Sequence, residues 1–160
     1  MTVDVGSTAP DFTLMNQDRE PVTLSAARGR PVLLAFFAAA FSGTCVKELC
    51  TLRDTLARLN LVSAQVYGIS VDSFFALKAF RAAQALGFPL LSDFNKEVIR
   101  TYGVFNEDMI GLKGIAKRSV FVIDGDGVVR YREVLDDARN EPDYERVFAV
   151  LASLAAPPRR

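Results

Sequence analysis

Unbroken apolar runs along this chain predict its central strands. Three of them, over 31–39, 65–71 and 119–124, are rich in bulky side chains, which is typical of strands buried on both faces of a sheet. A fourth run, over 128–134, follows a Gly-Asp-Gly turn and is expected to pair with 119–124 as a hairpin. Alternation around a polar turn within 11–24 indicates two short N-terminal strands.

Helical periodicity occupies the intervals between these runs. After the first run, apolar positions recur every third or fourth residue, which predicts an amphipathic helix. These positions are Cys45, Leu49, Leu52, Leu56 and Leu59. Further helices are expected over 73–86, 96–102 and 143–154. The first of these would begin at Asp72 or Ser73.

Phenylalanine is frequent on both sides of the 45–59 helix. Phe36, Phe37 and Phe41 lie in or just after the apolar run that precedes it and are expected in the core. Three more are either core residues or a surface for a partner, namely Phe74, Phe75 and Phe80.

The order of these elements predicts an α/β fold. Strands and helices alternate and close with a hairpin and a helix, so we expect a central mixed sheet flanked by helices, with an N-terminal β-hairpin. A thioredoxin-like fold has this order. The 160 residues suit one domain over 1–160, with 155–160 as a flexible tail.

The balance of charge argues against nucleic-acid and membrane partners. Nineteen Lys and Arg residues offset nineteen Asp and Glu residues, so the chain lacks the basic excess that binds phosphate backbones or anionic lipid. Its longest apolar run, over 32–41, is too short to cross a bilayer core of about 30 Å as a helix. The first residues carry no basic and apolar leader pattern, so we expect a cytoplasmic location.

The two cysteines are placed for reactivity rather than for a structural disulfide, which a reducing compartment disfavours. Cys45 falls in the first turn of the predicted helix, where unpaired N–H groups favour a thiolate, and Gly43 would let such groups approach a bound oxygen. Cys50 lies five positions on, about 8–9 Å away in an ideal helix. A disulfide needs Cα atoms within about 7 Å, so this pair would bond only after the helix start unwinds. Alternatively, both cysteines are small core residues.

The absence of histidine removes several other thiol chemistries. The chain has no His, so a Cys–His nucleophile pair has no base. No further ligands accompany the Cys-x4-Cys pair as a zinc site would require, and the Cys-x-x-Cys reductant motif is absent. Attack by a thiolate on an already weak O–O or S–S bond remains.

At this point a resemblance to a known family becomes specific. The segment FFAAAFSGTCVKELC resembles the peroxidatic segment of peroxiredoxins, Pro-x-x-x-(Thr/Ser)-x-x-Cys. The similarity covers nearly the whole chain, in the family's order, through GSTAPDFTL, PVLLAFF, VYGISVDS, FPLLSDFNKEVIRTYGV and RSVFVIDGDGVVRY. The second cysteine is similar to that of the bacterioferritin-comigratory, or peroxiredoxin Q, subgroup.

The resemblance implies a role for each of five residues. Cys45 would be the peroxidatic cysteine and Cys50 the resolving one, so that the two form an intramolecular disulfide. Ser42 would hydrogen-bond the peroxide, Arg118 would flank the thiolate, and Glu48 would orient the arginine. Each of the last three also has a simpler interpretation: Ser42 as a helix cap, Arg118 as a solvated charge at a strand edge, and Glu48 as a first-turn acid.

The peroxide pocket itself departs from the family pattern at one position. The resemblance places peroxide against Gly43, Thr44 and Ala38, but Ala38 stands where the family has proline. This exchange leaves room for larger hydroperoxides.

The implied function is thiol-dependent reduction of hydrogen peroxide and organic hydroperoxides, recycled by thioredoxin or a similar dithiol protein. No metal, haem or flavin is needed, and the chain is expected as a monomer or homodimer. Two alternatives remain open. One is a one-cysteine peroxidase resolved by an external thiol, with Cys50 buried, and the other is a non-enzymatic thioredoxin-fold redox sensor or holdase.

Overall fold

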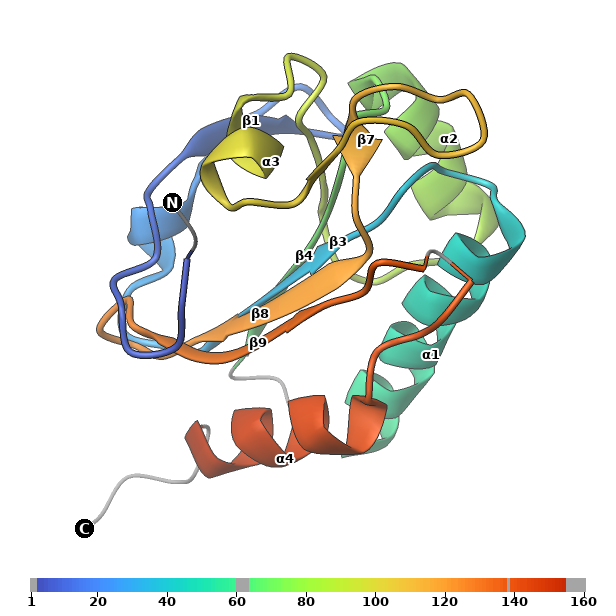
Figure 1. Ribbon diagram of the computed structural model, residues 1–160. Helices are drawn as coiled ribbons and strands as arrows, with labels where there is room; N and C mark the ends of the chain where they lie inside the picture. The colour runs from blue at the N-terminus through green and yellow to red at the C-terminus, as the bar shows by residue number, and fades with distance from the viewer. Residues whose placement is uncertain (1–2, 60–63, 138, 155–160) are drawn as a thin grey trace, which may run out of the picture.

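A computed structural model describes residues 3–59, 64–137 and 139–154, and within these residues one mixed sheet has seven strands (Figure 1). In their order across the sheet they are β2 (Pro21–Thr23), β1 (Thr13–Asn16), β5 (Leu90–Ser92), β4 (Gln65–Ser70), β3 (Val32–Phe36), β8 (Ser119–Ile123) and β9 (Val129–Val134). The thioredoxin-like α/β fold predicted from the order of elements is confirmed.

The centre of the sheet consists of the apolar runs seen in the sequence. β3 pairs in parallel with β4 and antiparallel with β8, and all five residues of both β3 and β8 are buried. β8 and β9 form the expected hairpin. The N-terminal hairpin of β1 and β2 extends the same sheet, because β1 pairs antiparallel with β5.

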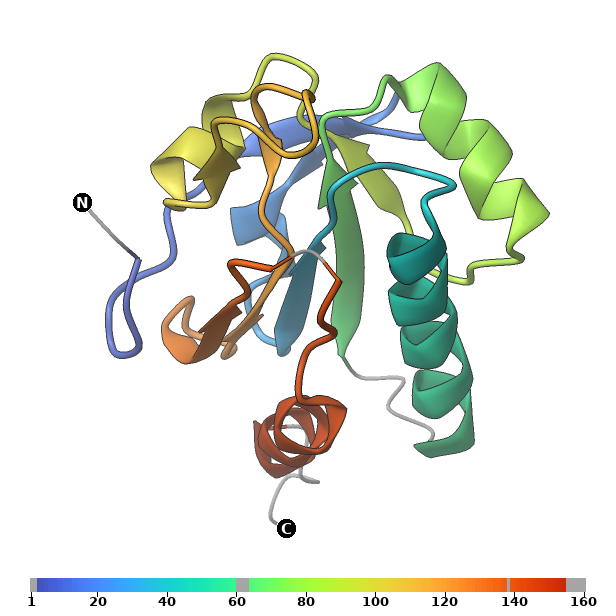
Figure 2. The ribbon, with the colours of Figure 1, turned by 45° about the vertical axis from the view of Figure 1, so that its right-hand side comes forward.

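The helices cover both faces of the sheet (Figure 2). They are α1 (Gly43–Leu59), α2 (Phe74–Ala83), α3 (Glu97–Thr101) and α4 (Tyr144–Leu154), with a 3₁₀ turn η1 (Leu24–Ala27). Side chains of β3 alternate between two apolar clusters. Leu33 and Ala35 pack in one with α1, α2 and α4, whereas Leu34 and Phe36 pack in the other with α3 and η1.

Some boundaries differ from those expected. The 73–86 helix begins as predicted, with the Ser73 hydroxyl accepting the Ala76 N–H at 3.2 Å, but it ends at Ala83 because Ala85 adopts a left-handed backbone with φ of 52°. β6 (Phe105–Asn106) and β7 (Ile115–Ala116) form a two-stranded ribbon that was not expected. The proposed tail over 155–160 lies outside the described residues.

The predictions for the phenylalanines before α1 and on α2 have different outcomes. Phe36, Phe37 and Phe80 are fully buried. Phe41 is 54% exposed, so its prediction as core was wrong. Its φ of 69° turns the chain before α1, and its ring meets the edge of Phe80 with the centroids 5.0 Å apart. On α2, Phe75 is 69% exposed.

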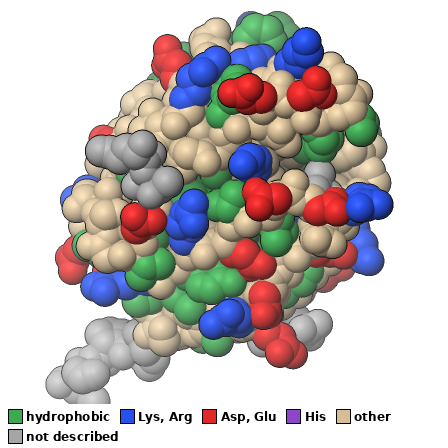
Figure 3. Space-filling view, in the orientation of Figure 1, with side chains coloured by type: hydrophobic (Ala, Val, Ile, Leu, Met, Phe, Trp, Pro, Cys, Tyr) green, Lys and Arg blue, Asp and Glu red, His purple; other side chains and the backbone are tan. Residues whose placement is uncertain are grey.

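Charged side chains of both signs are interspersed over the face shown in Figure 3. This distribution agrees with the equal numbers of basic and acidic residues in the sequence. In the part of the chain that the structure describes, no helix is both long enough and apolar enough to span a membrane.

Candidate active site

The connection from β3 to α1 brings Cys45 to the first turn of a helix, as the sequence predicted. Residues 37–42 form this connection, and the Ser42 carbonyl accepts the first helical hydrogen bond from the Val46 N–H at 2.9 Å. The Ser42 hydroxyl donates to the Ala39 carbonyl at 3.0 Å. Its oxygen therefore remains able to accept a bond from a ligand.

A buried guanidinium contacts the Cys45 thiol. Arg118 lies between β7 and β8, and its Nη2 is 3.2 Å from the Cys45 Sγ across 73 positions of sequence. Cys45 is fully buried, and the Arg118 side chain is only 1% exposed. Because burial leaves little water to screen it, the positive charge of Arg118 acts strongly on the sulfur. The prediction of Arg118 as a solvated strand-edge charge is excluded by its burial.

Glu48 completes the cluster from the next turn of α1. The Arg118 Nη1 donates to the Glu48 Oε1 at 2.7 Å, and the Glu48 side chain has no exposed surface. Its Oε2 is buried with no hydrogen-bond partner among the described residues. Burial raises the pKa of Glu48 to about 7, although Arg118 acts in the opposite direction. Burial alone would lower the pKa of Arg118, but the charges of Glu48 and Cys45 hold it above its usual range.

A cavity of about 620 Å³ opens over this cluster. Its lining includes the five predicted pocket residues Ala38, Ser42, Gly43, Thr44 and Arg118. It also includes six residues that the sequence analysis did not identify, namely Asp108, Met109, Ile110, Asp136, Asp137 and Arg139. These six belong to loops after β6 and β9, and only the folded chain brings them to the start of α1.

Cys50 lies one turn and a half further along α1, away from this cluster. It is a free, half-buried thiol, 3.5 Å from the side-chain oxygen of Gln84, the C-cap residue that follows α2. Arg53 donates to the Gln84 carbonyl on the same side of the helix. Because α1 is continuous from Gly43 to Leu59, the two cysteines cannot bond in this conformation.

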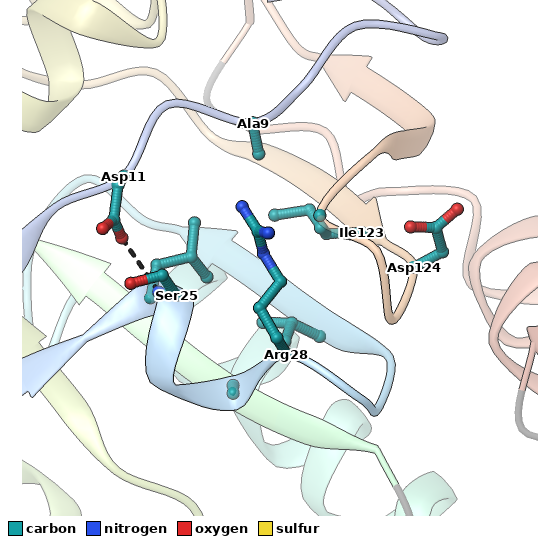
Figure 4. Close-up of a pocket in the computed structure, with 10 residues that line it drawn as sticks. Ala9, Asp11, Ser25, Arg28, Ile123 and Asp124 are labelled. Carbon is teal, nitrogen blue, oxygen red and sulfur yellow. Dashed lines mark hydrogen bonds between the residues drawn. The ribbon is translucent and has the colours of Figure 1, made fainter.

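A second, much smaller cavity shares no lining residue with the cavity over Arg118. It lies where the N-terminal segment crosses the β8–β9 hairpin (Figure 4). Its volume is about 10 Å³, room for about one water molecule. The Asp11 carboxylate accepts the Ser25 N–H at 2.9 Å. The Arg28 guanidinium fills the space that a Cβ on Gly127 would need, 2.6 Å away. We assign this cavity no catalytic role.

A thiol held against a guanidinium at a helix start, in a thioredoxin-like sheet, is typical of an enzyme that uses a cysteine nucleophile. Among the described residues, no three His, Cys, Asp or Glu side chains gather to hold a metal ion. The chain belongs to the AhpC/TSA family, which matches residues 5–132.

Curated relatives and solved structures agree with this family. The chain is 43% identical over 135 residues to alkyl hydroperoxide reductase E of Mycobacterium tuberculosis, covering 82% of this chain and 86% of the relative. It is 39% identical over 129 residues to chloroplastic peroxiredoxin Q of Oryza sativa subsp. japonica, covering 81% and 58%. The crystal structure of peroxidoxin BcpB from Mycobacterium tuberculosis superimposes with a TM-score of 0.83 and 31% identity, covering 95% and 98%. The protein is a peroxiredoxin, a thiol-dependent peroxidase.

Proposed function

We propose that this protein reduces hydrogen peroxide and organic hydroperoxides through a two-cysteine cycle, with Cys45 as the peroxidatic thiol and Cys50 as the resolving thiol. The observation that carries the proposal is the 3.2 Å contact between the Arg118 guanidinium and the Cys45 sulfur. Glu48 holds the other side of the same guanidinium at 2.7 Å and so orients it toward the sulfur.

In the first step, the Cys45 thiolate attacks the terminal oxygen of the hydroperoxide. An S–O bond forms and the O–O bond breaks. The leaving oxygen departs as alkoxide or hydroxide and takes a proton to become an alcohol or water, and Cys45 becomes a sulfenic acid. Arg118 stabilises both the thiolate and the negative charge that develops on the leaving oxygen.

The start of α1 holds the peroxide for this attack. The first N–H groups of a helix have no intrahelical acceptor, and Gly43 and Thr44, the first two residues of α1, line the cavity together with Ser42. These donors and the acceptor oxygen align the O–O bond with the sulfur. Ala38, on the same wall, leaves room for an alkyl group beside the peroxide.

In the second step, the first turns of α1 unwind and the Cys50 sulfur attacks the Cys45 sulfenic sulfur. A disulfide forms and one water leaves. A dithiol protein of the thioredoxin type then reduces the disulfide by exchange. The cycle uses no metal, haem or flavin. We place it in the cytoplasm of a cell, in a monomer or homodimer, with no nucleic acid or membrane partner.

The test is the mass of the intact protein after one equivalent of hydrogen peroxide, with free thiols alkylated before measurement. The wild type should lose two hydrogens and take no alkyl group. Cys50→Ser should gain one oxygen at Cys45 and form no intramolecular disulfide, and Cys45→Ser should not react on this timescale.

Other outcomes separate the alternatives. One added oxygen on wild-type Cys45, with Cys50 still alkylated, would indicate a one-cysteine peroxidase. A single oxidation without steady-state consumption of peroxide in the presence of a dithiol would indicate a sensor. Two alkyl groups on an unreacted chain would overturn the proposed cycle.

A further inference from the structure

In the proposed cycle, the connection 37–42 keeps one conformation for attack on peroxide and changes it for disulfide formation. The contacts that fix this conformation therefore affect both steps. Two hydrogen bonds tie its backbone to the end of β4. The Phe37 N–H donates to the Ile69 carbonyl at 2.9 Å, and the Ala40 N–H donates to the Asp72 Oδ2 at 2.8 Å. The first bond continues the β3–β4 ladder. The second is made by a side chain, and no step of the proposed cycle uses that side chain.

The Asp72 carboxylate is itself fixed by the sheet. The Ser70 hydroxyl donates to the same Oδ2 at 2.7 Å, and the Ser92 hydroxyl donates to the Asp72 carbonyl at 2.7 Å. Ser70 and Ser92 are both buried and face each other in register on β4 and β5. Buried hydroxyls of β4 and β5 therefore hold both the side chain and the main chain of Asp72.

The anchored connection is otherwise unfavourable. Phe41, the residue after Ala40, has a φ of 69°, a left-handed conformation that a bulky side chain rarely adopts. Ser42 follows directly, and Cys45 lies four residues after Phe41. Loss of the Ala40 contact would let Phe41 relax toward an ordinary backbone, and the start of α1 would move with it.

From these contacts we propose that Asp72 is a positioning residue. It holds the connection 37–42, and through it the start of α1, in the arrangement that attacks peroxide. Its release permits the unwinding that brings Cys45 to Cys50. This inference rests on the proposed two-cysteine cycle. Asp72 does not line the cavity, and its carboxylate bonds Ala40 and Ser70 rather than the sulfur, so it acts on the balance between the two steps and not on the chemistry of either.

The kinetic test compares Asp72→Ala, Asp72→Asn and Ser73→Ala with the wild type. Because the chain has no tryptophan, the sulfenic acid and the disulfide are counted by rapid quench, alkylation and mass spectrometry. Asp72→Ala should slow sulfenic acid formation about tenfold or more while speeding disulfide formation. Asp72→Asn keeps a carbonyl oxygen that can accept the Ala40 N–H. Both of its rates should therefore lie close to those of the wild type.

Ser73→Ala is the matched control. It removes the adjacent cap of α2, so it weakens the same region without touching the Asp72 carboxylate, and both rates should stay near those of the wild type. If Asp72→Ala left the ratio of the two rates unchanged, the proposal would be overturned.

Hydrogen exchange tests the same role without peroxide. Amides in the first two turns of α1 should exchange faster in Asp72→Ala than in Ser73→Ala or the wild type. Unchanged exchange there would count against Asp72 as the anchor. A wild-type chain that failed to consume peroxide would refute the proposed function, and this measurement would still decide the role of Asp72.

Discussion

Arg118 bonds two acidic groups with one guanidinium. Cys45 and Glu48 are both fully buried, and ionisation of both would leave one negative charge more than this guanidinium neutralises. A buried charge without full compensation is strongly unfavourable. A negative charge on Glu48 therefore competes with one on the Cys45 sulfur for the same guanidinium.

The titration of Glu48 should appear in the stability of the reduced protein. Burial raises its pKa from 4.5 to about 7, so between these values the folded state binds more protons than the unfolded state. The free energy of unfolding should fall as the pH rises from about 5 to 7.5, by on the order of 1–3 kcal/mol from this group. Denaturant unfolding across this range, under reducing conditions, measures the fall.

Glu48→Gln removes the titrating group and should flatten this dependence. Glu145→Gln, an exposed acid in the first turn of α4, is the control and should keep the wild-type slope. A Glu48→Gln protein with the wild-type slope would show that Glu48 does not titrate in this range.

Part of the site could be predicted from the sequence. Ser42 and Cys45 follow a family motif, and Arg118 matches the family by its position in a distant strand. The structure places Ser42 and Arg118 on one cavity and Arg118 against the Cys45 sulfur. The sequence predicts Asp72 only as a possible helix start. Its proposed role could not be predicted, because its contact with Ala40 spans 32 positions of sequence. Met109 and Ile110 carry no motif, and only the turn after β6 brings them to the cavity.

At the scale of elements, β4 packs closely against its neighbours at Gly68. A Cβ there would lie 2.7 Å from the Leu90 Cδ2 and 3.4 Å from the Phe37 ring. Leu90 and Phe37 are both fully buried, so neither side chain has room to turn away. The close packing of β3, β4 and β5 thus depends on the absence of one side chain.

Gly68→Ala should destabilise the fold by about 1–3 kcal/mol, the usual penalty for overpacking a core. Because Phe37 begins the connection to α1, peroxide reduction should slow as well. Chemical denaturation measures the first effect. Gly87→Ala, where nothing lies within 4 Å of the added Cβ, should be close to wild type. A Gly68→Ala protein as stable as Gly87→Ala would contradict the packing argument.

The sequence pattern located long elements better than short ones. Runs such as 119–124 are apolar throughout because both faces of the strand are covered, and that cause is visible in the sequence. β6 and β7 have two residues each, which is too few to show the alternation of apolar and polar residues by which a strand is recognised. The early end of α2 has a similar explanation, because the left-handed turn at Ala85 occurs at a residue with no turn preference of its own.

At the scale of the whole molecule, α1 is part of the core that oxidation must disturb. Leu49 and Leu52 are fully buried in the cluster on its side of the sheet. A Cys45–Cys50 disulfide requires the turns around Leu49 to unwind. The oxidised protein should therefore melt at a lower temperature than the reduced protein, although disulfides usually stabilise.

Calorimetry of the reduced and oxidised forms measures this difference, and a dithiol should restore the higher melting temperature. Cys50→Ser treated with the same equivalent of peroxide is the control, since it cannot form the bond and should shift less. An equal or higher melting temperature for the oxidised wild type would mean that the disulfide forms without unwinding α1.

The alternation of β3 between two apolar clusters has a consequence for repeated turnover. The cluster that contains α3 and Tyr102 includes none of the described side chains of α1. Unwinding of α1 would therefore remove none of the described side chains from this cluster. In the proposed cycle, each oxidation and reduction would then repeat a local rearrangement on one face of the sheet rather than a folding reaction of the whole domain.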